Sequence, residues 1–349
     1  MVDAFPGFNE IELAEFRIRY LSELVDKVVI AESSLTQSGL EKKLYFQDWL
    51  ENQTADLQNK IEVLKVPLEK LHTSWEREIF TREFLMDHLR ITYPNARFIL
   101  SDLDEIPSIS QVEKLRQTDG IFHFQTPTFF RKINWQLKDQ HLFWARGVMG
   151  QVSMALYPNG GRFTKTFPWI DASPGGHFSW LGVDQNSIAK KSQAAAHVEL
   201  NDNYWSSKVF IDFCDRYRID HLGRSRSTGF GLFHVIYPLP VGILTDLSVS
   251  LPQLVDSCET LPNYLSRIWA SMKVTAYVGE TKFSKITRNR YQIEYFLESN
   301  NLKIHFLVFI ELLFSFAAIL KRRMKNVLGR YLIKLKRLRS FVKLPPLLI

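Results

Sequence analysis

Cysteine is scarce in this chain, and the first residues show no sign of a signal peptide. The two cysteines, Cys214 and Cys258, are too few for a disulfide framework or a thiolate zinc cluster. Residues 1–5 lack the basic and apolar segments of a signal peptide, so we expect none. The composition, 46% hydrophobic and 23% charged, is that of a globular protein and excludes a disordered or collagen-like chain.

The main part of the chain, residues 1–302 (here called the body), is not basic, because the excess positive charge is confined to the C-terminal end. The whole chain has a net charge of +7. Residues 303–349 hold eleven Lys and Arg and one acid, Glu311, which leaves a net charge of −3 for residues 1–302. A slightly acidic body lacks the basic surface that binds nucleic acid, so we expect no nucleic-acid partner.

The C-terminal residues predict a helical, membrane-associating tail over 303–349. Residues 305–320 are mostly apolar, but sixteen helical residues span only about 24 Å, less than the ~30 Å hydrocarbon core of a bilayer. Residues 321–343 repeat apolar side chains at helical spacing and carry ten Lys and Arg with no acid, a pattern typical of helices that lie on anionic membranes. The alternative is a core-packing helix with a solvated basic face. We expect a membrane-associated protein, attached peripherally on the cytoplasmic face.

Strand-like and helix-like stretches alternate through the first hundred residues. A helix is expected over residues 9–24, and the capping-box spacing of residues 73–76 predicts the start of another. Buried strands are expected at residues 2–5, 25–31, 61–66 and 97–101. Strands separated by helices predict an α/β fold with a parallel sheet, in which ligands bind beyond the carboxyl ends of the strands. Residues 120–180 favour a mixed β region that completes the site.

Two aspartates follow the last of these strands, in the segment SDLDEIP at residues 101–107. On an extended chain, the i, i+2 spacing of Asp102 and Asp104 would point both carboxylates to one side. Adjacent carboxylates repel one another unless a cation lies between them, and a divalent ion shared with phosphate oxygens is the usual solution. Most D-x-D patterns are merely solvated turns, but the position after a buried strand favours a functional one.

The order of the motifs resembles glycosyltransferase family 17. The motifs are FNEIEL from residue 8, VVIAESSLTQSG from residue 28, LYF from residue 44, WE from residue 75 with Arg82, DLDEIP from residue 102 and GGHFSW from residue 175. A later K…H-x-E segment contains Lys190, Lys191, His197 and Glu199. The resemblance covers roughly residues 3–199, more than half of the chain.

The resemblance implies a GT-A-like nucleotide-sugar-binding fold with a mostly parallel central sheet. It also implies an inverting N-acetylglucosaminyltransferase, similar to the β-1,4-mannosyl-glycoprotein 4-β-N-acetylglucosaminyltransferases, with UDP-GlcNAc as donor, a glycan as acceptor, and Mn²⁺ or Mg²⁺. The transferase domain would then occupy residues 1–260, with a donor half at about 1–120 and an acceptor half at about 121–260. A helical connector would follow at residues 261–302, before the tail.

The same resemblance implies a metal site. Asp104 would bind the ion directly, and Asp102 would reach it directly or through water, or hold the ribose. His177, placed in a Gly-Gly-His turn, would complete the site. Trp180 would stack on a sugar or pack in the core.

Nucleotide-binding roles are implied as well. Phe8, Asn9 and Glu10, at the first strand-to-helix turn, would line the nucleotide, and Glu32 would accept hydrogen bonds from uracil or ribose. Arg82 would reach the donor phosphates, or would simply pair with Glu78 one helical turn away.

An inverting transfer needs a general base to take the proton from the acceptor hydroxyl. Glu105, beside the aspartates, is one candidate, although it also suits a structural cap. Asp171 and Asp184, on either side of the Gly-Gly-His segment, are the others. Two further functions compete with sugar transfer: a metal-dependent phosphohydrolase or nuclease, and a non-catalytic glycan-binding module tethered to a membrane. A nuclease needs more clustered acids and a basic groove.

Overall fold

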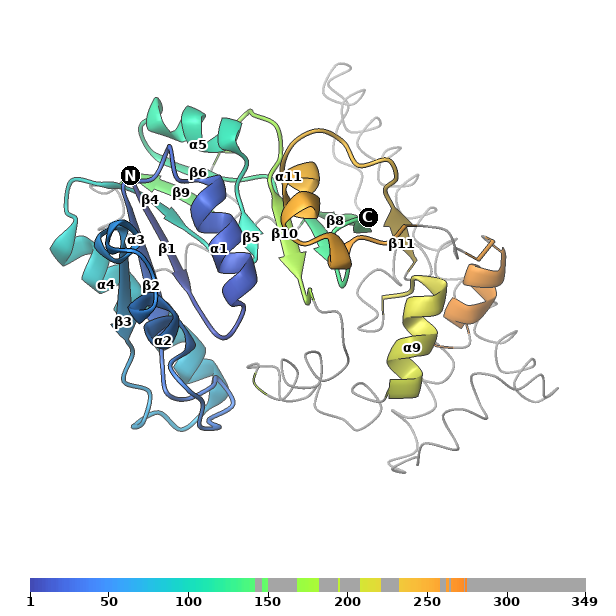
Figure 1. The fold of residues 1–349 in the computed structure, drawn as a ribbon, viewed down its shortest axis with the longest axis horizontal. Helices are drawn as coiled ribbons and strands as arrows, with labels where there is room; N and C mark the ends of the chain where they lie inside the picture. Colours follow the sequence, from blue (N-terminus) through green and yellow to red (C-terminus); the bar gives the residue numbers. More distant parts are fainter. Residues whose placement is uncertain are drawn as a thin grey trace, which may run out of the picture.

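The computed structural model describes residues 1–141, 146–149, 168–181, 194, 208–220, 232–257, 262–263, 265–272 and 274 (Figure 1). The predicted base Asp184, the segment 190–191, the pair His197 and Glu199, and the tail 303–349 lie outside these residues. Within the described part of the chain, no helix is both long and apolar enough to cross a membrane.

A six-stranded sheet with the order β3-β2-β1-β4-β9-β6 forms the first layer. Its strands are β1 (Val2–Pro6), β2 (Lys27–Glu32), β3 (Ile61–Lys65), β4 (Arg97–Leu100), β6 (Ile121–His123) and β9 (Arg146–Met149). The four strands β3, β2, β1 and β4 are parallel, whereas β9 is antiparallel to both β4 and β6. The prediction of an α/β fold with a mostly parallel sheet is confirmed.

Helices cover both faces of this sheet, because its central strands are apolar on both sides. Val28 and Ile30 of β2 pack with α1 (Ile11–Tyr20), α2 (Tyr45–Glu51) and α5 (Ile109–Arg116), whereas Val29 and Ala31 pack with α4 (Ser74–Thr92). A short helix, α3 (Ala55–Lys60), precedes β3. The predicted capping box is confirmed: Thr73 accepts the Glu76 N–H at 3.1 Å, and Glu76 accepts the Thr73 N–H at 2.9 Å.

A second sheet, with the order β11-β8-β7-β10-β5, stands beside the first (Figure 1). Its strands are β5 (Glu105–Ile106), β7 (Pro127–Phe130), β8 (Trp135–His141), β10 (Gly176–Ser179) and β11 (Phe233–Val235). The remaining described elements are α9 (Lys208–Tyr217), α11 (Ile243–Ser250) and the 3₁₀ turn η2 (Pro252–Leu254). Helix α11 lies beside β10 (Figure 1), and the buried residues of α11 and η2 belong to the same core cluster as those of α1. Strand β4 of the first sheet leads through residues 101–104 into β5 of the second, so the two aspartates lie at the junction of the two sheets.

The Gly-Gly-His segment is a strand, which corrects the predicted turn. Gly176 pairs with Ile106 and His177 pairs with Glu105 in the antiparallel ladder between β10 and β5. A Cβ atom on Gly175 would lie only 2.2 Å from the carbonyl oxygen of Ile106. Gly175 therefore allows close approach of the backbone of residues 106–108 and does not form a tight turn.

Candidate functional site

A cavity of about 200 Å³ lies beyond the carboxyl ends of β1, β2 and β4. The strand order runs from β1 to β2 and β3 on one side and to β4 on the other, so the chain changes direction here. Ligands of open α/β sheets bind in the crevice at such a switch point. The cavity is lined by Pro6, Gly7, Phe8, Glu10, Ala31, Ser33, Leu35, Thr36, Gln37, Lys42, Leu68, Thr81, Arg82, Asp102, Leu103, Asp104 and Ala194.

Gly7 lets the chain leave β1 at the edge of this cavity. A Cβ atom at Gly7 would lie 2.4 Å from the ring of Phe46 and 2.9 Å from Ile30, both of which are fully buried. Of the three residues predicted next to it, Phe8 and Glu10 line the cavity, whereas Asn9 is exposed and is not part of the lining. The predicted nucleotide-facing role of Asn9 is therefore not supported by its position.

Residues 102–105, here called the aspartate turn, follow β4. The Glu105 N–H donates to the Asp102 carbonyl at 3.0 Å and closes the turn. The expectation of an extended chain is therefore wrong, because β4 ends at Leu100. Both Asp102 and Asp104 nevertheless line the cavity, together with the buried Leu103 between them.

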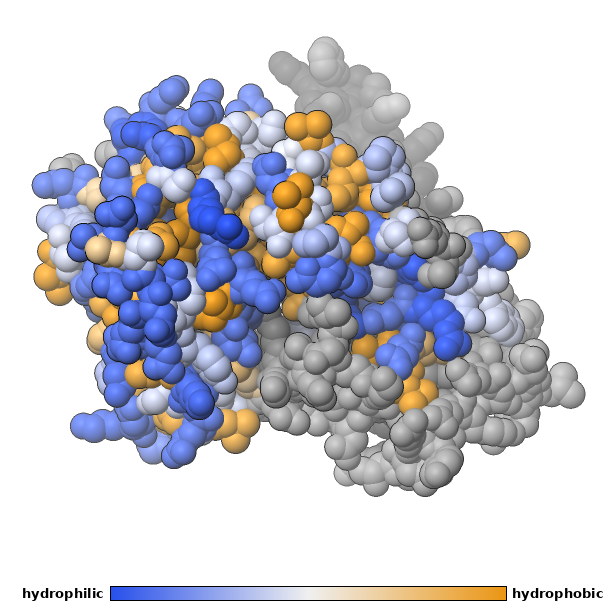
Figure 2. All heavy atoms as spheres, viewed as in Figure 1, coloured by the Kyte–Doolittle hydropathy of each residue, from blue (hydrophilic) through white to orange (hydrophobic). Residues whose placement is uncertain are grey.

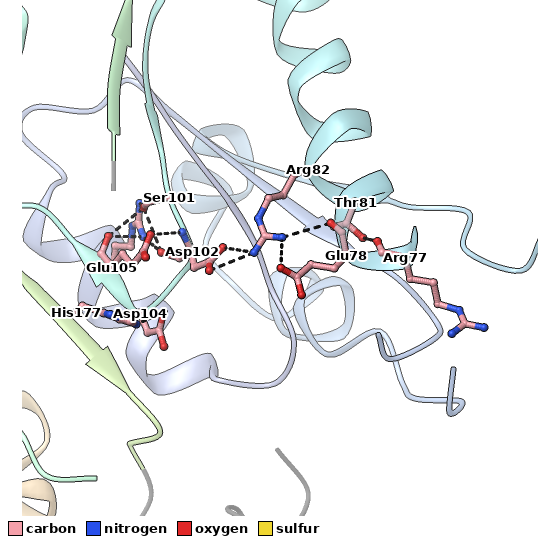
Figure 3. Close-up of polar contacts among 10 residues, drawn as sticks. Arg77, Glu78, Thr81, Arg82, Ser101, Asp102, Asp104, Glu105 and His177 are labelled. Atoms are coloured by element: carbon pink, nitrogen blue, oxygen red, sulfur yellow. Dashed lines mark hydrogen bonds and ion pairs between the residues drawn. The ribbon is translucent and has the colours of Figure 1, made fainter. Parts of the chain in front are cut away.

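Asp102 is held by Arg82 of helix α4 (Figure 3). The Arg82 Nη2 donates to both carboxylate oxygens of Asp102, at 2.9 and 3.3 Å, and its Nη1 donates to Glu78 Oε1 at 2.7 Å. The predicted i, i+4 pair with Glu78 is confirmed, and Arg82 also lines the cavity. Arg82 thus joins α4 to the aspartate turn and places a positive charge at the cavity wall.

Asp104 lies beside His177 on the other side of the turn (Figure 3). The Nε2 atom of His177 is 3.6 Å from Oδ1 of Asp104, and the Phe178 N–H donates to the Asp104 carbonyl at 2.7 Å. The side chains of Asp104 and His177 are 15% and 10% exposed. Strand β10 therefore brings an imidazole nitrogen close to the carboxylate of Asp104.

The three predicted metal ligands do not form one cluster. Among the described residues, no group of three His, Cys, Asp or Glu side chains is placed to hold a metal ion. Asp102 faces Arg82, and only Asp104 and His177 are neighbours. The predicted set of three ligands is therefore not assembled in the structure, in which Asp104 and His177 are the two members whose side chains approach each other.

Glu32 is buried and is not part of the cavity lining, which corrects its predicted contact with uracil or ribose. Its carboxylate accepts the N–H groups of Phe46 and Gln47 at 3.0 to 3.2 Å, at the start of α2. Lys42 Nζ donates to it at 3.1 Å. Glu32 therefore satisfies a helix N-terminus, where a negative charge is favourable.

Lys42 is the member of this pair that reaches the cavity. Its ammonium lies over the rings of Phe8 and Tyr45, 5.7 and 5.4 Å from their centroids. Burial lowers the pKa of Lys42 below its usual value, and the Glu32 carboxylate opposes that shift. Lys42 Nζ also donates to the carbonyl oxygen of Phe8 at 3.4 Å and so holds the Phe8 backbone in place.

Neither described candidate for the general base faces the cavity. Glu105 is 1% exposed, and its Oε2 accepts the Asp102 N–H at 3.1 Å. Glu105 therefore acts as a structural cap, the alternative role given for it above, and the assignment of Glu105 as the general base is corrected. Asp171 is exposed and is not part of the cavity lining.

Sequence reasoning missed Lys42 and, behind the aspartate turn, Arg17. Arg17 is fully buried in α1, and its guanidinium contacts Asp3 and the aspartate turn. A signal was present: Leu13, Arg17 and Leu21 follow one another at four-residue spacing, which puts an arginine in the apolar stripe of a helix. Asp3 is likewise an acid within an apolar strand.

The model of glycosyltransferase family 17 matches residues 1–204, more than half of the chain. The chain belongs to this family. The match contains every element of the parallel sheet and all residues that line the cavity. The resemblance seen in the motifs is thereby confirmed.

Three curated relatives carry the same name, beta-1,4-mannosyl-glycoprotein 4-beta-N-acetylglucosaminyltransferase. The human protein is 31% identical over 130 residues, which cover 34% of this chain and 24% of the human one. The rat and mouse proteins are 32% and 31% identical over the same length and with the same coverage. The similarity thus spans about a quarter of the length of each relative.

Proposed function

We propose that this family 17 member is a metal-dependent, inverting N-acetylglucosaminyltransferase that moves N-acetylglucosamine from UDP-GlcNAc to a glycan acceptor. The observation that carries the proposal is the cavity at the strand switch point, lined by Asp102, Asp104 and Arg82, with His177 beside Asp104. The family and the names of the relatives support the reaction class. We also propose that the fold is a GT-A-like nucleotide-sugar-binding fold.

Asp104 and His177 suit a divalent cation such as Mn²⁺ or Mg²⁺. These two side chains would hold the ion, since His177 Nε2 and Asp104 Oδ1 are 3.6 Å apart and both groups are largely shielded from solvent. A carboxylate oxygen and an imidazole nitrogen are both ligands that Mn²⁺ accepts. When bound, the ion would supply positive charge against the diphosphate of the leaving nucleotide.

The residues of the chain would bind and orient the donor. Arg82 fixes the carboxylate of Asp102 and brings a guanidinium, which suits phosphate oxygens, to the cavity wall. Phe8 lines the cavity, and Lys42 contacts both its ring and its carbonyl oxygen. The acceptor base is assigned to none of the described carboxylates, and Asp184 stays a prediction.

Donor binding and metal dependence test this function directly. Calorimetry with UDP-GlcNAc, UDP-Glc, UDP-Gal and GDP-Man, with and without Mn²⁺, should show metal-dependent binding that is tightest for UDP-GlcNAc. Asp104→Asn should abolish the metal dependence. Asp87→Asn, which changes an exposed carboxylate on α4, is the matched control. Binding that ignores Mn²⁺, or equal behaviour of the two variants, would contradict the proposal.

The tail is proposed to hold the enzyme on an anionic membrane surface, peripherally and on the cytoplasmic face. The support is its charge pattern, with eleven basic residues against one acid in residues 303–349. The full chain should sediment with phosphatidylserine liposomes but not with phosphatidylcholine liposomes. A chain that ends at residue 302 should stay in solution with both. Equal sedimentation of the two chains would refute the proposal.

A further inference from the structure

A charged side chain with no exposed surface lies directly behind the aspartate turn. Arg17 is 0% exposed, and its guanidinium rests on the ring of Phe5, 4.5 Å from the centroid. In Figure 2, hydrophilic residues cover much of the molecular surface over the first sheet. A buried guanidinium must instead find all its hydrogen-bond partners inside the protein, because burying an unpaired charge is costly.

Every nitrogen of this guanidinium has a partner. Nε and Nη2 donate to the two carboxylate oxygens of Asp3 at 2.8 and 2.5 Å, and Nη2 also donates to Ser101 Oγ at 2.9 Å. Nη1 donates to three carbonyl oxygens of the aspartate turn, those of Asp102, Leu103 and Glu105, at 2.8, 3.2 and 3.3 Å. One side chain therefore joins β1 to the backbone of the turn.

The convergence of three carbonyls on one nitrogen fixes which way the turn faces. With the carbonyls of Asp102 and Leu103 directed at Arg17, the carboxylates of Asp102 and Asp104 lie on the cavity side. Ser101 reinforces this, since its hydroxyl lies 3.1 Å from the Asp102 carbonyl and 3.0 Å from that of Glu105. A lysine offers a point charge without the planar fork, so it cannot reproduce the set of contacts.

We propose that Arg17 is a positioning residue for the proposed metal and donor site: it holds the aspartate turn in the one arrangement that presents Asp104 to His177. The inference rests on the proposed function for its consequence, metal affinity, but not for the ordering of the turn. A residue that served only the stability of the core would not set the orientation of residues 102–105. Arg17 does not line the cavity and acts solely through the turn.

Two measurements on the full chain separate positioning from stability. Hydrogen exchange reports the turn itself, since the Asp102 N–H donates to Glu105 Oε2 at 3.1 Å and the Glu105 N–H to the Asp102 carbonyl at 3.0 Å. Electron paramagnetic resonance of free Mn²⁺ reports metal affinity. The variant is Arg17→Lys. The matched control is Leu21→Ala, four residues later at the C-cap of α1 and 1% exposed, which loosens the core without touching the turn.

Arg17→Lys should accelerate exchange selectively in peptides that contain residues 102–105 and should weaken Mn²⁺ binding about tenfold or more. Leu21→Ala should melt earlier but leave both readouts at the turn unchanged. Unchanged exchange and Mn²⁺ affinity in a folded Arg17→Lys protein would overturn the inference, as would equal changes in the control.

Ser101→Ala keeps the test decisive should Arg17→Lys fail to fold. This variant removes one acceptor of Arg17 and one hydroxyl beside the turn, so smaller changes in the same direction are expected, and their absence would refute the role. If the wild-type chain binds neither Mn²⁺ nor UDP-GlcNAc, the proposed function fails, whereas the exchange data still decide whether Arg17 orders the turn.

Discussion

The guanidinium of Arg82 reaches both carboxylate oxygens of Asp102, at 2.9 and 3.3 Å, and ties helix α4 to the aspartate turn. Both groups are largely shielded, with 11% and 26% of the side chains exposed. Asp102 is therefore oriented by protein contacts before any ligand arrives. The position of the Asp102 carboxylate depends on α4, a helix that begins at a capping box 28 residues earlier in the chain.

Arg82→Lys is expected to lower kcat/KM for the proposed transfer by about 10- to 100-fold, with little loss of thermal stability. The charge remains, but a lysine cannot contact Asp102 and Glu78 together as the planar fork does. Steady-state kinetics against the donor would measure the loss. Arg90→Lys, on the same helix and paired with the exposed Asp87, is the control. Equal losses in both variants would mean that Arg82 only stabilises the helix.

His177→Ala is expected to weaken Mn²⁺ binding by at least about tenfold in the presence of UDP. The imidazole is one of the two protein groups proposed to hold the ion, and the fold should tolerate its loss because β10 is held by backbone pairing on both sides. Calorimetry would provide the affinity. His234→Ala, an exposed histidine on β11, should bind Mn²⁺ as the wild type does. Wild-type affinity in His177→Ala would exclude His177 from the site.

Local patterns predicted the parallel sheet well. The parallel strands are short segments rich in apolar residues, and the capping box at Thr73 involves residues only three apart. Such signals are complete within a short window of sequence, so the strands and α4 appear where expected. The family assignment followed from the order of several such windows.

The predictions that failed concern residues whose contacts lie far away in the chain. Glu32 was expected to face a ligand because it ends a strand. Its carboxylate instead accepts hydrogen bonds from α2 and Lys42, which the pattern of the strand itself does not predict. The turn geometry at Asp102 depends on Arg17, 85 residues earlier. His177 was placed in a turn because glycines often form turns, whereas here Gly175 allows the backbone before β10 to approach β5.

Gly175→Ala is expected to destabilise the protein by about 1–3 kcal/mol and to weaken Mn²⁺ binding as well. The added Cβ atom would lie 2.2 Å from the Ile106 carbonyl oxygen and 2.8 Å from the Cα atom of Pro107, so β10 must move away from β5. His177 would then shift relative to Asp104. Thermal denaturation and Mn²⁺ titration would detect the two effects. A stable variant with normal Mn²⁺ affinity would show that the strands tolerate the shift.

Asp3→Asn is expected to lower the free energy of unfolding by about 3–5 kcal/mol, because it leaves the buried Arg17 without its counter-charge. Denaturant unfolding followed by circular dichroism would measure the change. Asp119→Asn removes a surface pair with Arg97, in which the carboxylate is 77% exposed, and should cost less than about 1 kcal/mol. A small effect of Asp3→Asn would mean that the neighbouring carbonyls and Ser101 alone compensate the guanidinium.

Tyr93 gives the protein a specific sensitivity to alkaline pH. Burial, together with the hydrogen bond from its hydroxyl to Glu62 at 2.8 Å, raises the pKa of Tyr93 from 10.0 to about 12. A folded-state pKa above the unfolded value stabilises the protein fully below about pH 10 and loses that contribution as the pH rises towards 12. The stability of the wild type should therefore fall more steeply between pH 10 and pH 12 than that of Tyr93→Phe, as measured by urea unfolding. Glu62→Gln, which removes the charge that opposes the phenolate, should reduce the difference, and parallel curves for all three proteins would contradict the assignment.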